Sequence, residues 1–229
     1  MSELLLRYKE IVPEPRPAVS ERLLKAIRVG LDHGEAAVVS QLSGAALNMA
    51  WMAVGLKRGG DWPPGYAAKN AAAILDPTAR ELLAAATDVG WCLGPANQFW
   101  SPEWIVAIDQ PTFDELQAAL DIPKGQPDPH LRLGRALGYP EADVLIFAKF
   151  AGRDAKITAA LAKSPDLGRY QTYVPYTESG VETLREAARR IQAVFGVRPP
   201  IQPDPQLDSF KKKQPSGNLI ASSEAISEA

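Results

Sequence analysis

The stretch from Pro129 to Phe150, PHLRLGRALGYPEADVLIFAKF, decides how its part of the chain folds. Its apolar residues recur at helical spacing on both sides of Gly138-Tyr139-Pro140. Glycine commonly ends a helix in the left-handed conformation, and proline fits the first turn of the next helix. The stretch therefore predicts a helix, a tight turn with a positive φ at Gly138, and a second helix.

Two helices joined by a short turn also form the DNA-binding helix-turn-helix unit. A recognition helix needs exposed Arg, Lys, Asn or Gln to reach base edges, whereas this one opens with Glu141 and Asp143 and continues with Leu, Ile and Phe. The net charge of -2 also gives no basic surface for a phosphate backbone. We interpret the stretch as a helical hairpin of the core and expect no nucleic-acid partner.

The composition is that of an ordinary globular protein. The chain has 229 residues, of which 46% are hydrophobic and 23% charged, enough for one substantial core. From about Pro203 onward it is rich in Pro, Lys, Ser and Glu, a composition with little apolar surface to bury. We predict an α+β fold, a helix-rich single domain with a small central sheet over residues 1–202, followed by a disordered, flexible tail over 203–229.

Several classes of protein are disfavoured by what the sequence lacks. Cys92 is the single cysteine, and His33 and His130 are far apart, so we expect neither disulfides nor a metal site. The sequence has no run of 18 apolar residues and no signal-peptide pattern, so we expect a cytoplasmic protein with no membrane partner. Nucleotide-binding, zinc-protease and serine-hydrolase motifs are absent as well, and we expect no cofactor.

The expected elements outside the hairpin follow from caps and periodicity. They are a helix from Ser20 to about Asp32, a strand and then a helix within Glu35 to Leu56, a helix from Asp76, a strand at Trp104 to Asp109, a helix from Thr112 to Leu120, a helix from Asp154 to Lys163, a strand from Arg169 to Pro175, and a helix from Ser179 to about Phe195. The segment from Glu35 to Leu56 is ambiguous, and we favour strand before helix there. Trp51 within it is expected in the core.

The run Leu133 to Glu141, LGRALGYPE, with Val144 and Phe147 after it, resembles a family of uncharacterised prokaryotic proteins. Their pattern is LGYPECCVxxF, followed later by a strand end of the form H-x-P-C and by a further cysteine. The resemblance covers residues 131–188, about a quarter of the chain. It bears on the fold and hardly at all on activity.

The cysteines of that pattern are replaced in this chain. Ala142 and Asp143 stand at the paired cysteines, the later segment reads Tyr173-Val-Pro-Tyr176, and Gly180 stands at the last cysteine. If the family's cysteines bind metal or do redox work, the resemblance implies that this chain keeps the scaffold without that capacity.

The candidate site comes from the stretch Asp88 to Asp109, which holds three of the five tryptophans. A carboxylic acid in an aromatic, poorly hydrated pocket has a raised pKa and acts as acid and base near neutral pH. Glu103, between Trp100 and Trp104, is the predicted catalytic residue, with Asp109 as the second. The alternative is that Glu103 only begins a strand at the surface. The predicted substrate-binding residues are Trp62, Tyr66, Trp91, Asn97, Trp100 and Trp104. Trp62 and Tyr66 belong to a loop that is either a lid or a packed surface loop.

Two functional hypotheses follow. In the first, the protein is a small cofactor-independent biosynthetic enzyme that uses a carboxylate as acid and base on an aromatic or amine-containing molecule. The reaction would be a condensation or cyclisation of the Pictet-Spengler kind. In the second, it is a non-catalytic small-molecule-binding or assembly protein, with a homodimer as its candidate assembly. A closed pocket favours the enzyme, and a flat exposed aromatic patch favours the assembly protein.

Overall fold

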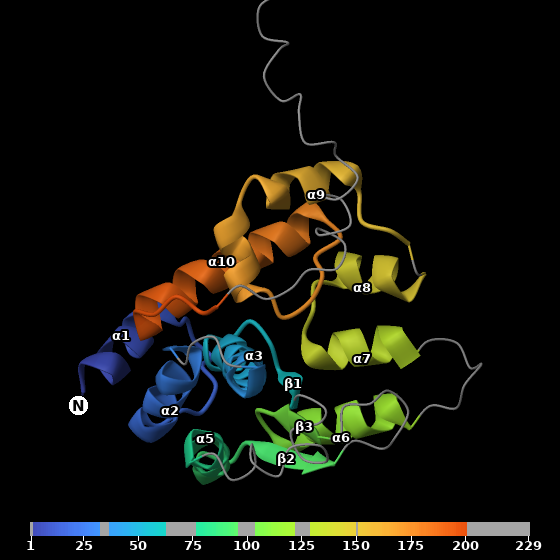
Figure 1. Cartoon of the computed structure of the whole chain (residues 1–229). Helices are drawn as coiled ribbons and strands as arrows, with labels where there is room; N and C mark the ends of the chain where they lie inside the picture. Colours follow the sequence, from blue (N-terminus) through green and yellow to red (C-terminus); the bar gives the residue numbers. More distant parts are fainter. Residues whose placement is uncertain are drawn as a thin grey trace, which may run out of the picture.

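The computed structural model describes residues 2–32, 37–62, 77–95, 104–121, 129–149 and 151–200. The helices are α1 (Glu3–Ile11), α2 (Glu21–Asp32), α3 (Ala37–Ala53), α5 (Pro77–Asp88), α6 (Gln110–Leu120), α7 (Pro129–Leu137), α8 (Glu141–Ala148), α9 (Ala155–Ala162) and α10 (Glu178–Phe195), with the 3-10 helix η1 (Pro165–Tyr170) before α10. Helices predominate and the sheet is small, as predicted (Figure 1). The predicted tail, 203–229, lies outside the described residues.

The larger core is helical. Helix α2 packs against both α3 and α5, and α1 lies beside α10 although the two are far apart in the sequence (Figure 1). Trp51 of α3 is 1% exposed, and its indole Nε1 donates a hydrogen bond to the carbonyl of Tyr170 at 2.7 Å. The prediction that Trp51 belongs to the core is therefore confirmed.

The sheet has three antiparallel strands in the order β1-β3-β2. They are β1 (Gly59–Trp62), β2 (Cys92–Pro95) and β3 (Trp104–Ala107). The predicted strand at Trp104 is thus present at the centre of the sheet. Ile105 and Ala107 of β3 join Leu116 and Leu120 of α6 in a second, smaller core, against which α7 packs.

The hairpin from Pro129 to Phe150 forms as predicted. Helix α7 ends at Leu137, Gly138 has φ +83°, and α8 begins at Glu141 after Pro140. The end of α7 is also hydrogen-bonded to the residue that precedes β1: the N–H of Arg58 donates to the carbonyl of Leu137 at 3.0 Å. The left-handed turn therefore joins the two helices to the segment that leads into the sheet.

Two predicted strands do not form. Residues 37–53 form the single helix α3, although their first part was expected to be a strand. The segment from Arg169 to Pro175 begins in η1 and continues without regular structure. A strand needs a neighbour for its backbone groups, and the N–H of Tyr176 just beyond this segment bonds to a side chain of α8 instead.

Two predicted helix caps are displaced towards the N-terminus. Helix α6 is capped by Asp109, whose carboxylate accepts from the N–H of Thr112 at 2.8 Å. Thr112 lies inside this helix, where it is fully buried and its hydroxyl accepts a hydrogen bond from Arg58. Helix α10 is capped by Thr177, two residues before the predicted Ser179. The cap at Ser20 is confirmed, since its hydroxyl accepts from the N–H of Leu23.

Replacing Gly138 with alanine should lower the free energy of unfolding by about 1 kcal/mol or more, because a side chain strains the left-handed conformation. The new Cβ would also lie 3.3 Å from the backbone nitrogen of Arg58. The measurement is chemical denaturation beside Gly152→Ala, a position with open space and no positive φ. Equal stability of the two variants would contradict the assignment.

Candidate functional site

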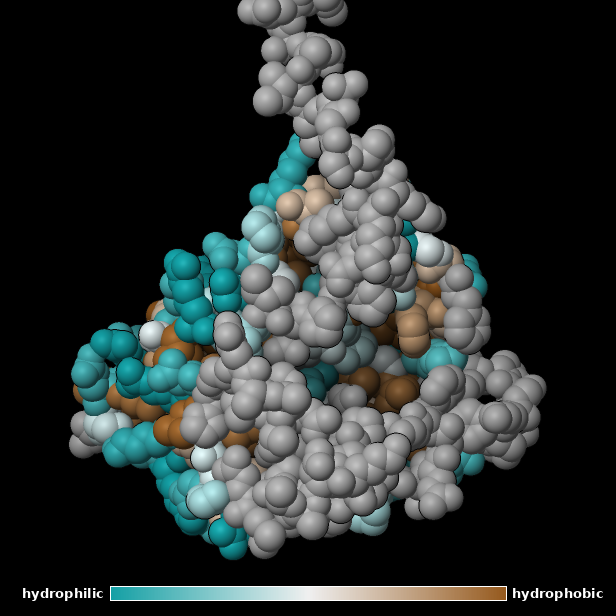
Figure 2. All heavy atoms as spheres, in the orientation of Figure 1, coloured by the Kyte–Doolittle hydropathy of each residue, from teal (hydrophilic) through white to brown (hydrophobic). Residues whose placement is uncertain are grey.

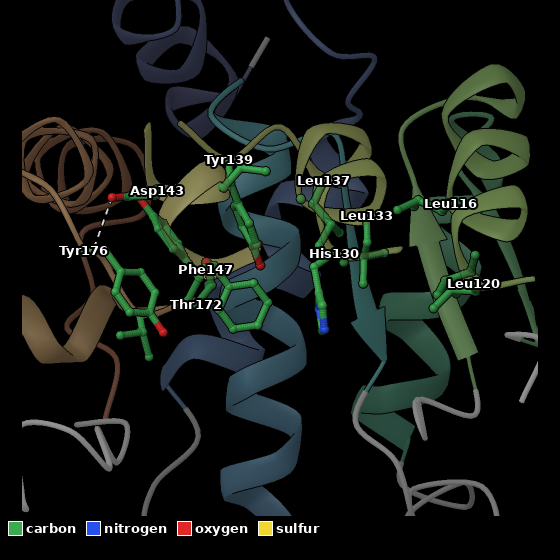
Figure 3. Close-up of a pocket in the computed structure, with 16 residues that line it drawn as sticks. Leu116, Leu120, His130, Leu133, Leu137, Tyr139, Asp143, Phe147, Thr172 and Tyr176 are labelled. Carbon is green, nitrogen blue, oxygen red and sulfur yellow. Dashed lines mark hydrogen bonds between the residues drawn. The ribbon is translucent and has the colours of Figure 1, made fainter. Parts of the chain in front are cut away.

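A cavity of about 380 Å³ lies where the hairpin α7–α8 meets α6, the sheet and the segment before α10 (Figure 3). Its lining divides into an aliphatic part and an aromatic, polar part. The aliphatic residues are Ile105, Leu116, Leu120, Leu133, Leu137, Val144 and Val174. The aromatic and polar residues are His130, Tyr139, Asp143, Phe147, Thr172, Tyr173 and Tyr176.

The helical periodicity of α7 and α8 places these side chains. His130, Leu133 and Leu137 recur along one face of α7, and Asp143 and Phe147 lie one turn apart on α8. Phe147 remains 42% exposed although it lines the cavity, so the cavity opens to solvent beside it. Figure 2 shows hydrophobic surface reaching the exterior around α7 and α8.

Aromatic rings pack edge to face and face to face along the cavity. The ring of His130 meets Phe147 edge-on at 5.0 Å between centroids, and Phe147 lies 6.1 Å from Tyr176. Tyr139 stacks on Tyr173 at 4.4 Å. Such contacts hold rings in fixed orientations, so the aromatic part of the cavity is preorganised.

Asp143 is the charged residue of this lining and is 2% exposed. Its Oδ1 accepts three hydrogen bonds, from the N–H of Tyr176 at 3.0 Å and from the N–H and hydroxyl of Thr177 at 2.8 and 2.7 Å. Because Thr177 is the N-cap of α10, the carboxylate also lies at the positive end of that helix dipole. Its Oδ2 is buried and has no hydrogen-bond partner among the described residues.

The hydroxyl of Tyr173 lies in the same environment. It donates a long hydrogen bond, 3.4 Å, to the carbonyl of Gly180. Burial raises the pKa of this phenol well above its ordinary value, and the nearby charge of Asp143 raises it further. Tyr173 is therefore neutral at physiological pH and acts as a hydrogen-bond donor rather than as a phenolate.

A buried lysine stands next to this wall. Lys57 is 2% exposed, and its ammonium donates to Oδ1 of Asn48 at 2.6 Å. The same nitrogen lies 5.0 Å from the centroid of Tyr139, a cation–π contact. Lys57 is not part of the cavity lining, whereas Tyr139 is.

Two of the residues predicted from the sequence have structural roles. Trp91 is 2% exposed and donates from its indole nitrogen to the carbonyl of Ala18 at 2.9 Å, in the helical core. Asp109 caps α6, and hydrogen bonds from Thr112 lower the pKa of its carboxyl, which favours the ionised form. Neither residue lines the cavity described above.

The remaining predicted residues are only partly placed. Trp62 and Trp104 are directly opposite each other in β1 and β3, and the structure describes only their backbone. The other predicted residues, Glu103, Tyr66, Asn97 and Trp100, lie outside the described residues. Their roles remain predictions.

The residues that sequence reasoning did not assign to a site are those of α7, α8 and the segment before α10. The structure brings Asp143, Tyr173, Tyr176 and Gly180 together. No local sequence pattern could predict this contact, because Asp143 and Tyr176 are more than 30 residues apart in the sequence.

The comparisons with known proteins give no family for this chain: no protein-family model, curated protein or solved structure matches it. Within the described ranges, no group of three or more His, Cys, Asp or Glu side chains is arranged to hold a metal ion. No helix of the described residues is long and apolar enough to cross a membrane.

Gly180→Ala should lower the free energy of unfolding by about 2 kcal/mol, since a Cβ there would lie 1.9 Å from Oδ2 of Asp143. In an Asp143→Ala background the same change should cost little, because the obstructing oxygen is gone and alanine suits a helix better than glycine. Chemical denaturation of the four proteins of this cycle measures the coupling. Equal costs in both backgrounds would show that the carboxylate does not exclude a side chain at this position.

Proposed function

We propose that this protein binds a small, mainly apolar aromatic molecule in the cavity between α6, α7, α8 and the segment before α10. The observation that carries the proposal is the cavity itself, about 380 Å³ with an aliphatic part and a preorganised aromatic part. Small-molecule sites are concave, largely apolar and equipped with a few polar groups that orient the ligand. A concave site also favours ligand binding over a flat assembly interface.

The apolar lining of the cavity also supports the binding of a small molecule. Seven aliphatic side chains line the cavity, and burial of apolar ligand surface against them contributes roughly 25 cal/mol per Å². Tyr139, Tyr173 and Thr172 belong to the more polar part of the lining. A ligand with an aromatic or aliphatic body and one polar end fits this division.

A thermal-shift screen of small aromatic molecules tests the proposal. A ligand present at 100 times its dissociation constant stabilises the folded state by about 2.7 kcal/mol, which raises Tm by about 5 °C or more in a protein of this size. In Leu133→Trp the larger side chain fills the cavity, so the ligand-induced shift should disappear.

The matched control is Leu145→Trp, on α8 and 40% exposed, outside the cavity lining. This variant should keep the full shift. Because each variant is compared with itself, with and without ligand, any loss of intrinsic stability does not enter the comparison. Equal shifts in both variants would place the ligand elsewhere and overturn the proposal.

A second candidate is the cofactor-free acid–base enzyme, and His130 is the observation that favours it. Its imidazole lines the cavity, held edge-on by Phe147, and imidazole is the side chain most often used for proton transfer in catalysis. In this form of the proposal the proton-transfer group is His130 or the Glu103 carboxylate assigned from sequence. The reaction remains a condensation or cyclisation of an aromatic molecule.

Turnover of ligands found in the screen separates these assignments. If His130 transfers the proton, His130→Gln should retain the ligand-induced shift and lose about a hundredfold or more in kcat. Glu103→Gln should then keep the kcat of the unmodified protein. The opposite result would support Glu103. Binding without turnover by the unmodified protein would support the binding function and contradict the enzyme hypothesis.

A further inference from the structure

We propose that the ligand of this cavity is uncharged: its polar end is a hydroxyl or carbonyl group, and molecules of the same shape with an ammonium or carboxylate group are rejected. This inference rests on the proposed binding function and names the chemical class of the ligand. It follows from the charged side chains in and beside the wall, Asp143 and Lys57, which are held by other groups of the protein and offer an ion in the cavity no partner.

Asp143 belongs to the lining, but its carboxylate is turned away from the cavity. Its Oδ1 accepts the hydrogen bonds from Tyr176 and Thr177. Its Oδ2 is buried and lies against the start of α10, where a Cβ at Gly180 would be 1.9 Å from it. Figure 3 shows the carboxylate directed towards Tyr176 and away from His130. Neither oxygen is therefore presented to a ligand.

The negative charge of Asp143 is also compensated inside the wall. Two N–H groups and one hydroxyl donate to Oδ1, and the N-terminus of a helix such as α10 carries about half a positive charge. Burial raises the pKa of the Tyr173 phenol, and the nearby charge of Asp143 raises it further, so this neighbour stays protonated. A cation in the cavity would thus meet a carboxylate whose charge is already stabilised by the protein.

An anion has no partner in the described lining either. Neither lysine nor arginine is among these residues. The ammonium of Lys57 donates to Oδ1 of Asn48 at 2.6 Å and lies over the ring of Tyr139, outside the lining. A carboxylate on the ligand would therefore be separated from this cation by the Tyr139 ring.

The cost of leaving water then decides between ligand classes. An ammonium or carboxylate group that loses its hydration without gaining a partner is destabilised far more than a hydroxyl or carbonyl group is. The rings of Phe147 and Tyr176 attract a cation, but an aromatic face recovers only a small part of the lost hydration. An uncharged polar group enters at a much smaller cost, so neutral molecules bind best.

The test uses three probes that share one phenylbutyl body: 4-phenylbutan-1-ol, 4-phenylbutylamine and 4-phenylbutyrate. Calorimetric titration of the full chain is done at about pH 8, where both ionisable probes are charged while ordinary imidazole and phenol groups are neutral. The alcohol should bind about tenfold or more tightly than either ion. Binding of the amine or the acid as tight as that of the alcohol would overturn the inference and leave the proposed function standing. Failure of all three probes to bind would overturn both.

A second arm supplies the missing partner. Phe147 lines the cavity and is 42% exposed, so Phe147→Glu places a carboxylate in the lining where water still reaches it. The ratio of amine to alcohol affinity should rise about fivefold or more. Leu145→Glu is the matched control, on the same helix, 40% exposed and outside the lining, and it should leave the ratio unchanged. Equal ratios in the two variants would contradict the inference. If Phe147→Glu does not fold, the order of the three probes on the unmodified protein decides.

Discussion

The carboxylate of Asp143 is the interaction on which this half of the molecule depends. Through one oxygen it joins α8 to the backbone of Tyr176 and to Thr177, the cap of α10. The segment before α10 pairs with no strand among the described residues, and the side chain of Asp143 supplies the acceptor that a strand would otherwise provide. Removing it would leave a buried N–H without a partner, at a cost of about 1–3 kcal/mol. The position of the cavity wall thus follows from one side chain.

Sequence reasoning succeeds where the deciding forces act between neighbouring residues. Gly138 and Pro140 define the turn between α7 and α8 by their own backbone preferences, and the structure has the turn at that place. Trp51 was placed in the core because its size and apolar surroundings favour burial, which is also observed. These properties belong to short stretches and need no knowledge of the rest of the chain.

Sequence reasoning fails where contacts between residues far apart in the sequence determine the structure. Val38 and Val39 suggest a strand, yet they belong to α3, whose later turns supply much of the helical core. Asp143 looks like an ordinary acid in the first turn of a helix, and nothing nearby in sequence shows that its partners lie more than 30 residues away. The cavity could not be predicted for the same reason, because its lining comes from three helices, the sheet and an irregular segment. The sequence favours the tryptophans as site residues, yet Trp91 is a core residue.

The division of the molecule into two apolar clusters has a consequence for how it can change. The larger cluster, around α2, α3, α5 and α10, includes neither Phe147 nor His130 nor Val144. Substitutions at these three positions would reshape the cavity while leaving the main source of folding free energy intact. Most proteins tolerate little loss of stability, so a wall that contributes little to it is free to vary under selection. Such an arrangement lets the shape of the cavity change at little cost to the stability of the fold.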